Sequence, residues 1–361
     1  MCKVLYISGS YPPEPCGIGH YLKNLVIRQK IYSKITIATI NPDPKSNNGI
    51  DLVKYPKDIF PLILKNKIDI IHWQLVTQGF RYSILFLLYF LLFRFLNRRI
   101  KIITTFHDFA TLKKLNQIRL LLPLICSHEI IATTEEQALF LKKWNRNVNI
   151  IPIGSNVNFT NKKKDIFQRK LKRELKILFW GFPVQNRMVF PLLGALNKLN
   201  NHFDFSLTFM PGFINISNSL KKQYLSCIQD FGLEKKIHYT GLLPENKMEK
   251  LLTSFDLAAL FYLDGVSVRR TTFIGLAGLA VPFITNFGSH TPTWLYKEIQ
   301  FSAVKHLEIE LIADKITEFT FQPDIFKAES EKLSKIIETD FNWESICKKH
   351  QKIYQNTRNH A

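Results

Sequence analysis

The sequence has few cysteines, and their spacing suits neither a disulfide framework nor a metal site. The five cysteines among 361 residues are odd in number and scattered, with no Cys-x-x-Cys pair. This pattern excludes a disulfide-stapled fold and a structural zinc, and it is typical of a reduced cytosolic protein. The sequence also lacks an Asp-x-Asp motif to hold a divalent cation. We therefore expect no metal and no bound cofactor.

No stretch of the sequence is apolar for long enough to cross a membrane as a helix. The nearest candidate, residues 84–93, has ten consecutive apolar residues, whereas a spanning helix needs about 20. Arg81 and Arg94 flank it. Two interpretations remain open: a helix buried against a sheet, or an interfacial helix whose arginines reach lipid head groups. A signal peptide is not expected, because residues 1–7 lead directly into a predicted strand.

Acidic residues are in deficit. The sequence has 49 Lys and Arg against 29 Asp and Glu, a net charge of +20. Such a surface attracts nucleic acid, acidic lipid or a phosphorylated substrate, although a solvated lysine-rich surface has the same composition. No helix-turn-helix, zinc-finger or RNP-like motif accompanies the charge, which argues against nucleic acid. The charge and segment 84–93 together favour a cytoplasmic protein attached peripherally to the inner face of the cell membrane.

Short apolar runs alternate with helical segments along most of the chain. In the first half, strands are expected at Val4–Ile7, Ile35–Ala38, Ile68–His72, Ile100–Thr105, Glu129–Ala132 and Asn149–Ile153, with helices at 19–29, 84–97 and 134–143. In the second half, strands are expected at Ile177–Trp180, Phe205–Phe209, Ile237–Tyr239, Leu257–Phe261 and Val281–Ile284, with helices at Met188–Leu199, Ser217–Phe231, Glu245–Thr253 and Thr272–Gly278. Strands apolar on both faces and separated by helices predict parallel, doubly wound sheets.

The length and the repeated pattern predict two domains. We place the first at residues 1–160 and the second at 177–340, with a basic linker at 161–176. A last helix at 343–355 is expected to pack back on the first domain. The predicted fold is α/β, with two doubly wound, Rossmann-like domains facing across a cleft.

Each predicted domain has a glycine-bearing loop between a buried strand and a helix. The first contains Gly17, Ile18 and Gly19; the second runs through Asp264, Gly265, Val266 and Ser267 to the basic pair Arg269 and Arg270. At such junctions, backbone N–H groups and the positive end of the helix dipole can hold phosphate oxygens. Two loops of this kind suggest a ligand with a diphosphate, bound in a cleft between the domains.

Polar residues at the predicted strand ends are further candidates. His107 ends the apolar run 102–106 and would point into the cleft, although a satisfied structural histidine is equally consistent with its position. Asp108 would orient His107 or meet an acceptor. His72 and Glu14 are candidate acceptor contacts, and their structural alternatives are a buried histidine and a residue that braces a turn.

Six motifs in sequence order resemble those of the retaining, α-mannosyltransferase-like GT-B glycosyltransferases (family-4 type) that build bacterial polysaccharides. They are Tyr11-Pro-Pro-Glu14 with Gly17-Ile-Gly19, Thr105-Phe-His-Asp108, Ile151–Val157, Tyr239–Pro244, Asp264–Arg270 with Ala280–Thr285, and Asn342-Trp-Glu344. The resemblance covers nearly the whole chain. It implies a nucleotide-sugar donor as co-substrate, an acceptor bound mainly by the first domain, and transfer without a metal.

The resemblance also assigns roles to individual residues. His107 matches the histidine that contacts the transferred sugar, with Asp108 beside it. Arg187 stands where the family usually has a phosphate-binding lysine, and Arg269 or Arg270 would add a second cation. These residues, with the two glycine loops, would stabilise the diphosphate leaving group. The implied reaction is transfer of a sugar to a lipid-linked or oligosaccharide acceptor.

The donor loop departs from the family pattern at one position. Many relatives have a second Glu eight residues after the first acidic residue, where it grips the ribose; here Asp264 is followed at that distance by Thr272. Thr272 would contact the donor or cap the next helix. Two hypotheses remain: an active enzyme that grips its donor differently, and a non-catalytic GT-B subunit that recruits a partner glycosyltransferase to the membrane.

Overall fold

The computed structural model describes residues 1–14, 16–43, 50–55, 58–65, 67–75, 91–95, 99–107, 109, 112, 114–165 and 173–359. The chain divides into two compact units. Unit 1 comprises Met1–Asn156 and Phe341–Ala361, and unit 2 comprises Val157–Asp340. The sequence-based boundaries were set at residues 160 and 340, with a linker to residue 176. Strand β8 already begins at Leu175, and residues 166–172 of that linker lie outside the described part of the chain.

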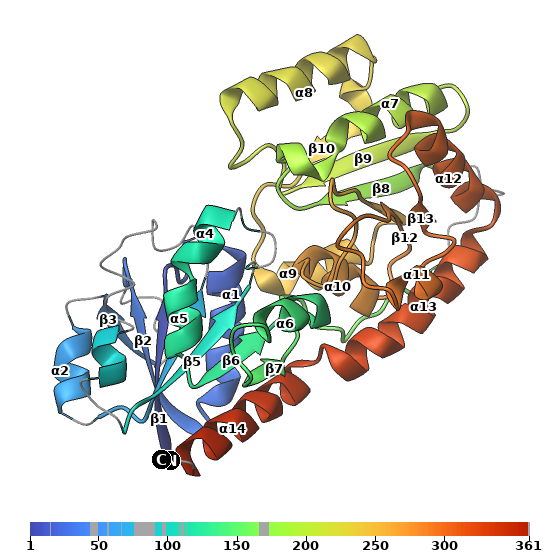
Figure 1. Cartoon of the computed structure of the whole chain (residues 1–361). Helices are drawn as coiled ribbons and strands as arrows, with labels where there is room; N and C mark the ends of the chain where they lie inside the picture. The colour runs from blue at the N-terminus through green and yellow to red at the C-terminus, as the bar shows by residue number, and fades with distance from the viewer. Residues whose placement is uncertain are drawn as a thin grey trace. The chain divides into compact units, whose positions relative to one another are not determined.

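Unit 1 is built on a parallel sheet. Within the described residues this sheet has seven strands in the order β3-β2-β1-β4-β5-β6-β7 (Figure 1). They are β1 (Cys2–Ser8), β2 (Ser33–Thr39), β3 (Asp51–Lys54), β4 (Ile70–Leu75), β5 (Lys101–Phe106), β6 (Glu129–Ala132) and β7 (Val148–Ile150). Every side chain of β4 is buried. A central strand of this kind requires cover on both sheet faces, which the helices supply.

The helices described in unit 1 are α1 (Gly17–Gln29), α2 (Ile59–Leu64), α4 (Lys114–Arg119), α5 (Leu121–Cys126), α6 (Glu135–Leu141) and α14 (Trp343–Asn359). Side chains of α2, α5 and α6 share one buried cluster with the strands. The N-cap residue of α6 is Thr134, whose side chain accepts a hydrogen bond from the Gln137 amide. This cap satisfies an amide that has no partner within the helix.

The last helix, α14, belongs to unit 1 although the whole of unit 2 separates it in sequence from the other elements of unit 1. The Tyr354 hydroxyl lies 2.6 Å from the Tyr6 hydroxyl of β1. Gln29 Nε2 of α1 donates to the Cys347 carbonyl over 2.7 Å, and Trp343 Nε1 donates to the Ser155 carbonyl over 2.7 Å. Helix α14 therefore completes the core of unit 1.

Unit 2 repeats the same architecture. Its described residues form a six-stranded parallel sheet in the order β10-β9-β8-β11-β12-β13. The strands are β8 (Leu175–Trp180), β9 (Phe205–Met210), β10 (Ile237–Tyr239), β11 (Leu257–Leu260), β12 (Phe283–Asn286) and β13 (Ala303–Val304). The helices are η4 (Gln185–Arg187), α7 (Val189–Leu199), α8 (Asn218–Asp230), η5 (Glu234–Lys236), α9 (Glu245–Leu252), α10 (Thr271–Gly278), α11 (Leu295–Glu298), α12 (Ile309–Phe321) and α13 (Pro323–Asp340).

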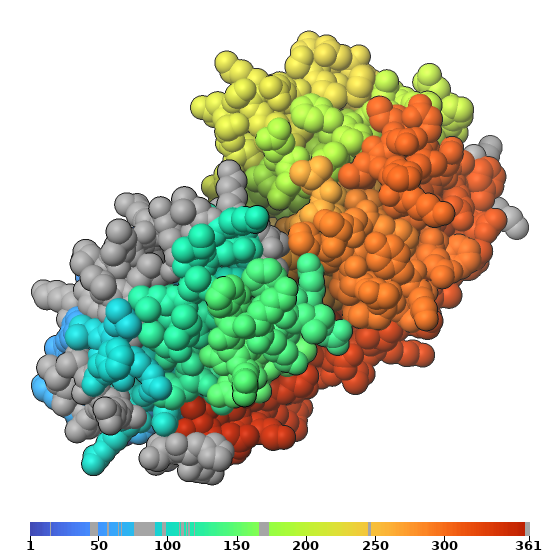
Figure 2. Space-filling model, viewed as in Figure 1, coloured from blue at the N-terminus to red at the C-terminus, as the bar shows by residue number. Residues whose placement is uncertain are grey.

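Helices α7, α8 and α12 bury their apolar residues with the sheet in a single core cluster. A side chain on Gly194 of α7 would lie 2.7 Å from Ile309 Cδ1, so this glycine lets α12 approach closely. The outer side of α12 lies at the surface of unit 2 in the view of Figure 2. Helix α13 packs against α10.

Both sheets have a topological switch point. Numbered within its own unit, each follows the order 3-2-1-4-5-6, extended by one strand in unit 1. The chain order reverses between β1 and β4 in unit 1, and between β8 and β11 in unit 2. In open α/β sheets, ligands bind beyond the carboxyl ends of the strands that flank this point.

The structure confirms the predicted doubly wound α/β fold and adds elements that the pattern missed. Strands β3 and β13 were not predicted. Residues 84–90 lie outside the described residues; in the adjoining helical stretch 91–95, Phe93 is buried, whereas Phe95 is 73% exposed. In the described part of the chain, no helix has both the length and the apolar character to span a membrane.

Candidate functional site

The loop after β11 is held tightly against the loop after β12. Gly265 has a φ of +82°, and a side chain there would overlap the backbone of Gly288 and lie 2.7 Å from Thr291 Oγ1. The His290 amide donates to the Asp264 carbonyl over 3.0 Å. Only glycine adopts this conformation at this spacing without strain. The two carboxyl-edge loops therefore form one compact structure.

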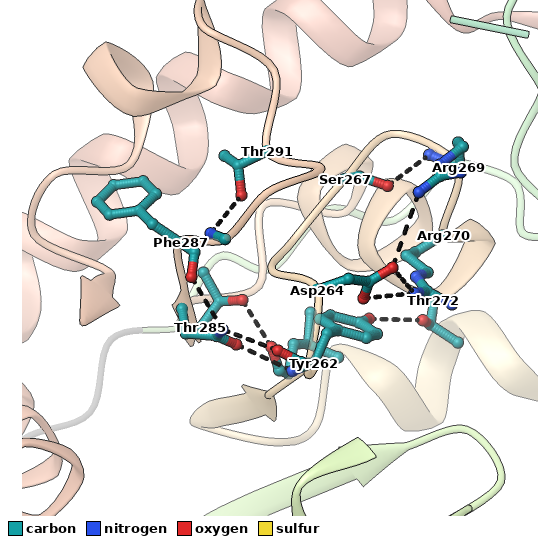
Figure 3. Close-up of polar contacts among 12 residues, drawn as sticks. Tyr262, Asp264, Ser267, Arg269, Arg270, Thr272, Thr285, Phe287 and Thr291 are labelled. Carbon is teal, nitrogen blue, oxygen red and sulfur yellow. Dashed lines mark hydrogen bonds and ion pairs between the residues drawn. The ribbon is translucent and has the colours of Figure 1, made fainter. Parts of the chain in front are cut away.

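Asp264 is held by the two arginines of its own loop. Arg270 Nη2 donates to both Asp264 carboxylate oxygens over 2.7 and 2.8 Å, and Arg269 Nη2 lies 3.7 Å from Oδ2 (Figure 3). The carboxylate thus offsets one of two positive charges. The sequence alone indicated no such pairing, because Asp264 and Arg270 were both expected to face the donor.

Arg187 also lies beside this loop. It belongs to η4, which follows β8 on the other side of the switch point. Its guanidinium carbon lies 4.4 Å from the Tyr262 ring centroid and 5.1 Å from that of Phe179, and Nη2 donates to the Trp180 carbonyl over 2.7 Å. Burial is the main cause that lowers the pKa of Arg187, which is only 7% exposed. Among the described residues, its Nε has no hydrogen-bond partner.

Tyr262 links the cations of this site. Arg187 and Arg270 both lie over its ring, at 4.4 and 4.9 Å from the centroid. Its hydroxyl lies 3.2 Å from Thr272 Oγ1. Sequence reasoning missed Tyr262, since the last aromatic residue of an apolar run looks like ordinary core. Arg187 and Arg270 contact this ring, Asp264 pairs with Arg270, and Arg269 lies near Asp264. The three arginines and the one aspartate sum to a local charge of +2.

Several donor-loop groups are already engaged within unit 2. The Gly265 amide donates to the Tyr262 carbonyl, and the Val266 amide donates to the Asn286 carbonyl. Neither amide points to a free phosphate site, contrary to the expectation for this glycine loop. The Ser267 hydroxyl accepts from the Arg269 amide over 3.3 Å, and a phosphate contact by the Ser267 amide stays a prediction.

Thr272 is not the cap of the following helix. Helix α10 begins at Thr271, and Arg270 occupies the N-cap position without a side-chain cap hydrogen bond. The capping interpretation of Thr272 was therefore wrong: the loop turns into the helix one residue earlier, and the Thr272 hydroxyl meets Tyr262 instead. Its contact with a donor stays a prediction.

In unit 1, the glycine loop leads into the N-terminus of α1. Gly17 is exposed and Ile18 is partly buried, whereas a side chain on Gly19 would lie 3.2 Å from Tyr11 Cα. Cys16, the N-cap residue, makes no side-chain cap bond, and the first turn has no acidic residue. The positive end of this helix is thus left without a carboxylate, as an anion site requires.

Of the two candidate acidic residues of unit 1, the structure describes Glu14 only. Glu14 Oε1 accepts a hydrogen bond from Asn41 Nδ2 over 3.1 Å, which ties the loop after β1 to the loop after β2. Its acceptor contact stays a prediction. Asp108 lies outside the described residues.

His107 and His72 occupy different environments at the same sheet edge. His107 is partly buried, its Nε2 lies 2.8 Å from Gln74 Oε1, and its ring meets the edge of Tyr21 at 5.5 Å. His72 is fully buried, with Nδ1 at 2.6 Å from the Tyr354 hydroxyl. An acceptor contact by His72 would require these bonds to rearrange. Helix α1 and His107 are brought together through Tyr21.

Burial keeps the histidines of this region neutral. It is the main cause that lowers the pKa of His107 and of His350 to about 4, with His350 adding a smaller effect on His107. Burial also lowers the pKa of His72, and the pKa of His128 is lowered to about 4, again chiefly by burial. In the unfolded chain, a histidine has a pKa of about 6.5.

Unit 1 is therefore expected to lose stability in mild acid. As the pH falls from about 6.5 toward 4, these histidines bind protons in the unfolded chain but stay neutral in the folded one. Each such histidine therefore lowers the free energy of unfolding by about 1.4 kcal/mol per pH unit in this window. Above this window the histidines do not lower the stability.

His350→Leu removes one such group and should flatten the dependence of unit 1 stability on pH. His202→Leu, at an exposed position in unit 2, should leave this dependence unchanged. Chemical unfolding followed by tryptophan fluorescence from pH 7.5 to 4.5 measures the slope; equal slopes in wild type and His350→Leu would contradict the prediction.

The described residues contain no group of three or more His, Cys, Asp or Glu side chains arranged to hold a metal ion. Positive charge at the candidate site comes from arginines instead. Each unit thus has its own candidate site: unit 2 has an arginine cluster at its switch point, and unit 1 has an uncapped helix terminus and a neutral histidine at its sheet edge.

Comparison with solved structures identifies the fold. A glycosyltransferase from Rickettsia africae has a TM-score of 0.73 at 16% identity, with 100% of this chain and 99% of that chain covered. Anabaena HepE in complex with UDP-glucose has a TM-score of 0.72 at 12% identity, covering 99% and 100%. WaaG, a glycosyltransferase involved in lipopolysaccharide biosynthesis, has a TM-score of 0.64 at 11% identity, covering 97% and 99%.

No family model matches the sequence, and no curated protein matches it. At these identities the structural likeness shows the fold: two Rossmann-like α/β units in one chain, the GT-B architecture.

Proposed function

We propose that the protein is a glycosyltransferase that transfers a sugar from a nucleotide-sugar donor to a lipid-linked or oligosaccharide acceptor, in the synthesis of a surface polysaccharide or other glycan. The observation that carries this proposal is the pair Arg187 and Arg270 over Tyr262, joined by Asp264 and Arg269, with a local charge of +2 at the switch point of unit 2. It stands in a GT-B fold, at the place where α/β sheets bind ligands.

The chemistry of transfer fits this cluster. When the bond from the sugar to the diphosphate breaks, negative charge grows on the leaving phosphate oxygens. Arginines fixed by stacking and by hydrogen bonds stabilise that charge without reorganising. The donor is the co-substrate, and no metal is needed in this scheme. A retaining outcome and the family-4 subtype are part of the proposal on the strength of the sequence motifs.

The named structures support the choice of donor. HepE is seen in complex with UDP-glucose and with UDP, and WaaG is described as acting in lipopolysaccharide biosynthesis. We further propose that the excess of basic residues attaches the protein peripherally to the anionic inner surface of the cell membrane.

A panel of sugar nucleotides tests the proposed activity. The purified chain is incubated with UDP-, GDP- and ADP-sugars and with membrane lipid or oligosaccharide extract, and mass spectrometry detects the released nucleotide and the product. We expect one donor to release its nucleoside diphosphate only when acceptor is present. No release, together with no thermal shift by any nucleotide, would contradict the proposal.

One observation favours a second candidate, the non-catalytic recruiting subunit. Thr272 replaces the carboxylate that grips the ribose in many relatives, and its hydroxyl bonds to Tyr262 rather than to a helix end. This candidate would be supported if the purified chain binds a nucleotide but transfers no sugar in the same panel, and if adding a partner enzyme produces transfer. Turnover by the purified chain alone would exclude it.

A further inference from the structure

A continuous chain of hydrogen bonds crosses unit 1 from its last helix to His107. The Tyr6 and Tyr354 hydroxyls lie 2.6 Å apart, and the Tyr354 hydroxyl lies 2.6 Å from His72 Nδ1. Gln74 Nε2 lies 3.3 Å from His72 Nε2, and Gln74 Oε1 lies 2.8 Å from His107 Nε2. Apart from His107, every side chain in this series is fully buried.

The chemistry of the amide group decides which ring nitrogens carry hydrogen. The Gln74 oxygen can only accept, so His107 Nε2 must donate and therefore bears the hydrogen. The Gln74 nitrogen can only donate, so His72 Nε2 must accept. The Thr105 hydroxyl, 2.8 Å from the same nitrogen, is a second donor to it. His72 then bears its hydrogen on Nδ1 and donates to Tyr354.

This assignment holds because both rings are neutral. Burial lowers the pKa of His107 to about 4 and also lowers that of His72, so that each ring has one hydrogen at pH 7. With the Nε2 hydrogen fixed by Gln74, the other nitrogen of His107, Nδ1, is a lone-pair acceptor. Among the described residues, Nδ1 has no hydrogen-bond partner.

We propose that Gln74 is a positioning residue that holds His107 in its Nε2–H tautomer, so that Nδ1 accepts a hydrogen bond from a hydroxyl group of the sugar substrate. The inference rests on the proposed function for the identity of the substrate, and on the hydrogen-bond chain for the tautomer. Helix α14 contributes Tyr354, which fixes the other end of this series of hydrogen bonds. A histidine held in this way selects a hydroxyl donor and rejects a carbonyl at the same place.

Nuclear magnetic resonance of the full chain tests the tautomer without any substrate. Protein labelled with ¹⁵N-histidine gives distinct nitrogen shifts for the two neutral tautomers, and His107→Gln identifies the signals of His107. We expect Nε2–H at pH 7.5. A signal for Nδ1–H, which corresponds to the reversed orientation of the Gln74 amide, would overturn the proposal.

Gln74→Leu tests the consequence of losing the contact. Leucine is similar in size and cannot hydrogen-bond, so His107 should populate both tautomers and lose its fixed ring orientation. Together these changes should lower kcat/KM about tenfold, the low end of the range for residues that orient a histidine ligand. Thr104→Val is the matched control: it removes a buried hydrogen bond, to Ser127 over 2.6 Å, from the neighbouring strand β5, and this bond is not part of the series from Tyr6 to His107. It should leave the tautomer and kcat/KM unchanged.

The two readouts separate the possible failures. A shifted tautomer in Gln74→Leu together with no transferase activity in wild type would sustain the positioning role and reject the proposed function. An unchanged tautomer, or unchanged kcat/KM in an active enzyme, would reject the positioning role. If Gln74→Leu does not fold, Gln74→Met, which is unbranched like glutamine, replaces it in both measurements.

Discussion

Gly265→Ala is expected to destabilise unit 2 by about 2–5 kcal/mol, the sum of about 1–2 for a left-handed side-chain conformation and about 1–3 for overpacking. The residue has a φ of +82°, and a methyl group there would overlap Gly288 and approach Thr291 Oγ1 to 2.7 Å. The loops after β11 and β12 would have to separate, which moves Asp264 and its two arginines. The measurement is chemical unfolding, together with calorimetric titration by nucleoside diphosphates.

Gly232→Ala provides the matched control for this variant. Gly232 lies in the same unit with a φ of +62°, and no heavy atom lies within 4 Å of an added methyl group. Its expected cost is the conformational strain alone, about 1–2 kcal/mol, with nucleotide binding unchanged. Equal losses of stability in the two variants, with binding retained in both, would show that the contact between the loops is not needed.

Arg187→Lys is expected to weaken the binding of the nucleotide donor about 10- to 100-fold, the range for losing a hydrogen bond to a charged group. The guanidinium carbon stacks at 4.4 Å over Tyr262, and Nη2 is anchored on the Trp180 carbonyl. An ammonium group keeps the charge but cannot stack or present two donors in a plane. Isothermal titration with UDP, GDP and ADP measures the loss directly.

Two control measurements accompany the Arg187→Lys titration. Arg146→Lys, at an exposed position of unit 1, should leave the affinity unchanged. Unfolding of Arg187→Lys shows whether the variant keeps the packing around Phe179. An intact variant that binds its nucleotide as tightly as wild type would remove Arg187 from the donor site.

The fold could be predicted from the sequence because its central strands are apolar on both faces. Runs such as Val4–Ile7 and Ile177–Trp180 can be placed only inside a sheet covered by helices, so the doubly wound fold followed from them. Strands β3 and β13 could not be predicted in this way. The first is only partly buried and the second has two residues, so neither produces a clear apolar run.

Arg187, Asp264 and Arg270 were named from loop position and family resemblance, and their role in donor binding stays a prediction. The structure brings them together: Arg187 and Arg270 lie over Tyr262, and Asp264 pairs with Arg270. Their internal pairing could not be inferred, since an aspartate and an arginine in one loop can pair or face a ligand equally well. The link from Gln74 to Tyr354 could not be predicted from the sequence, because it joins residues 280 positions apart through one buried histidine.

The position of α14 has a consequence for biosynthesis. Unit 2 is a continuous stretch of chain, Val157–Asp340, and all of its strands leave the ribosome before synthesis ends. Unit 1 is interrupted, and Tyr354, the partner of Tyr6 and His72, is translated only after the whole of unit 2. The usual N-to-C order of cotranslational folding is thereby reversed: the inserted unit can form its core first, and the earlier-made half waits for the final turns of helix.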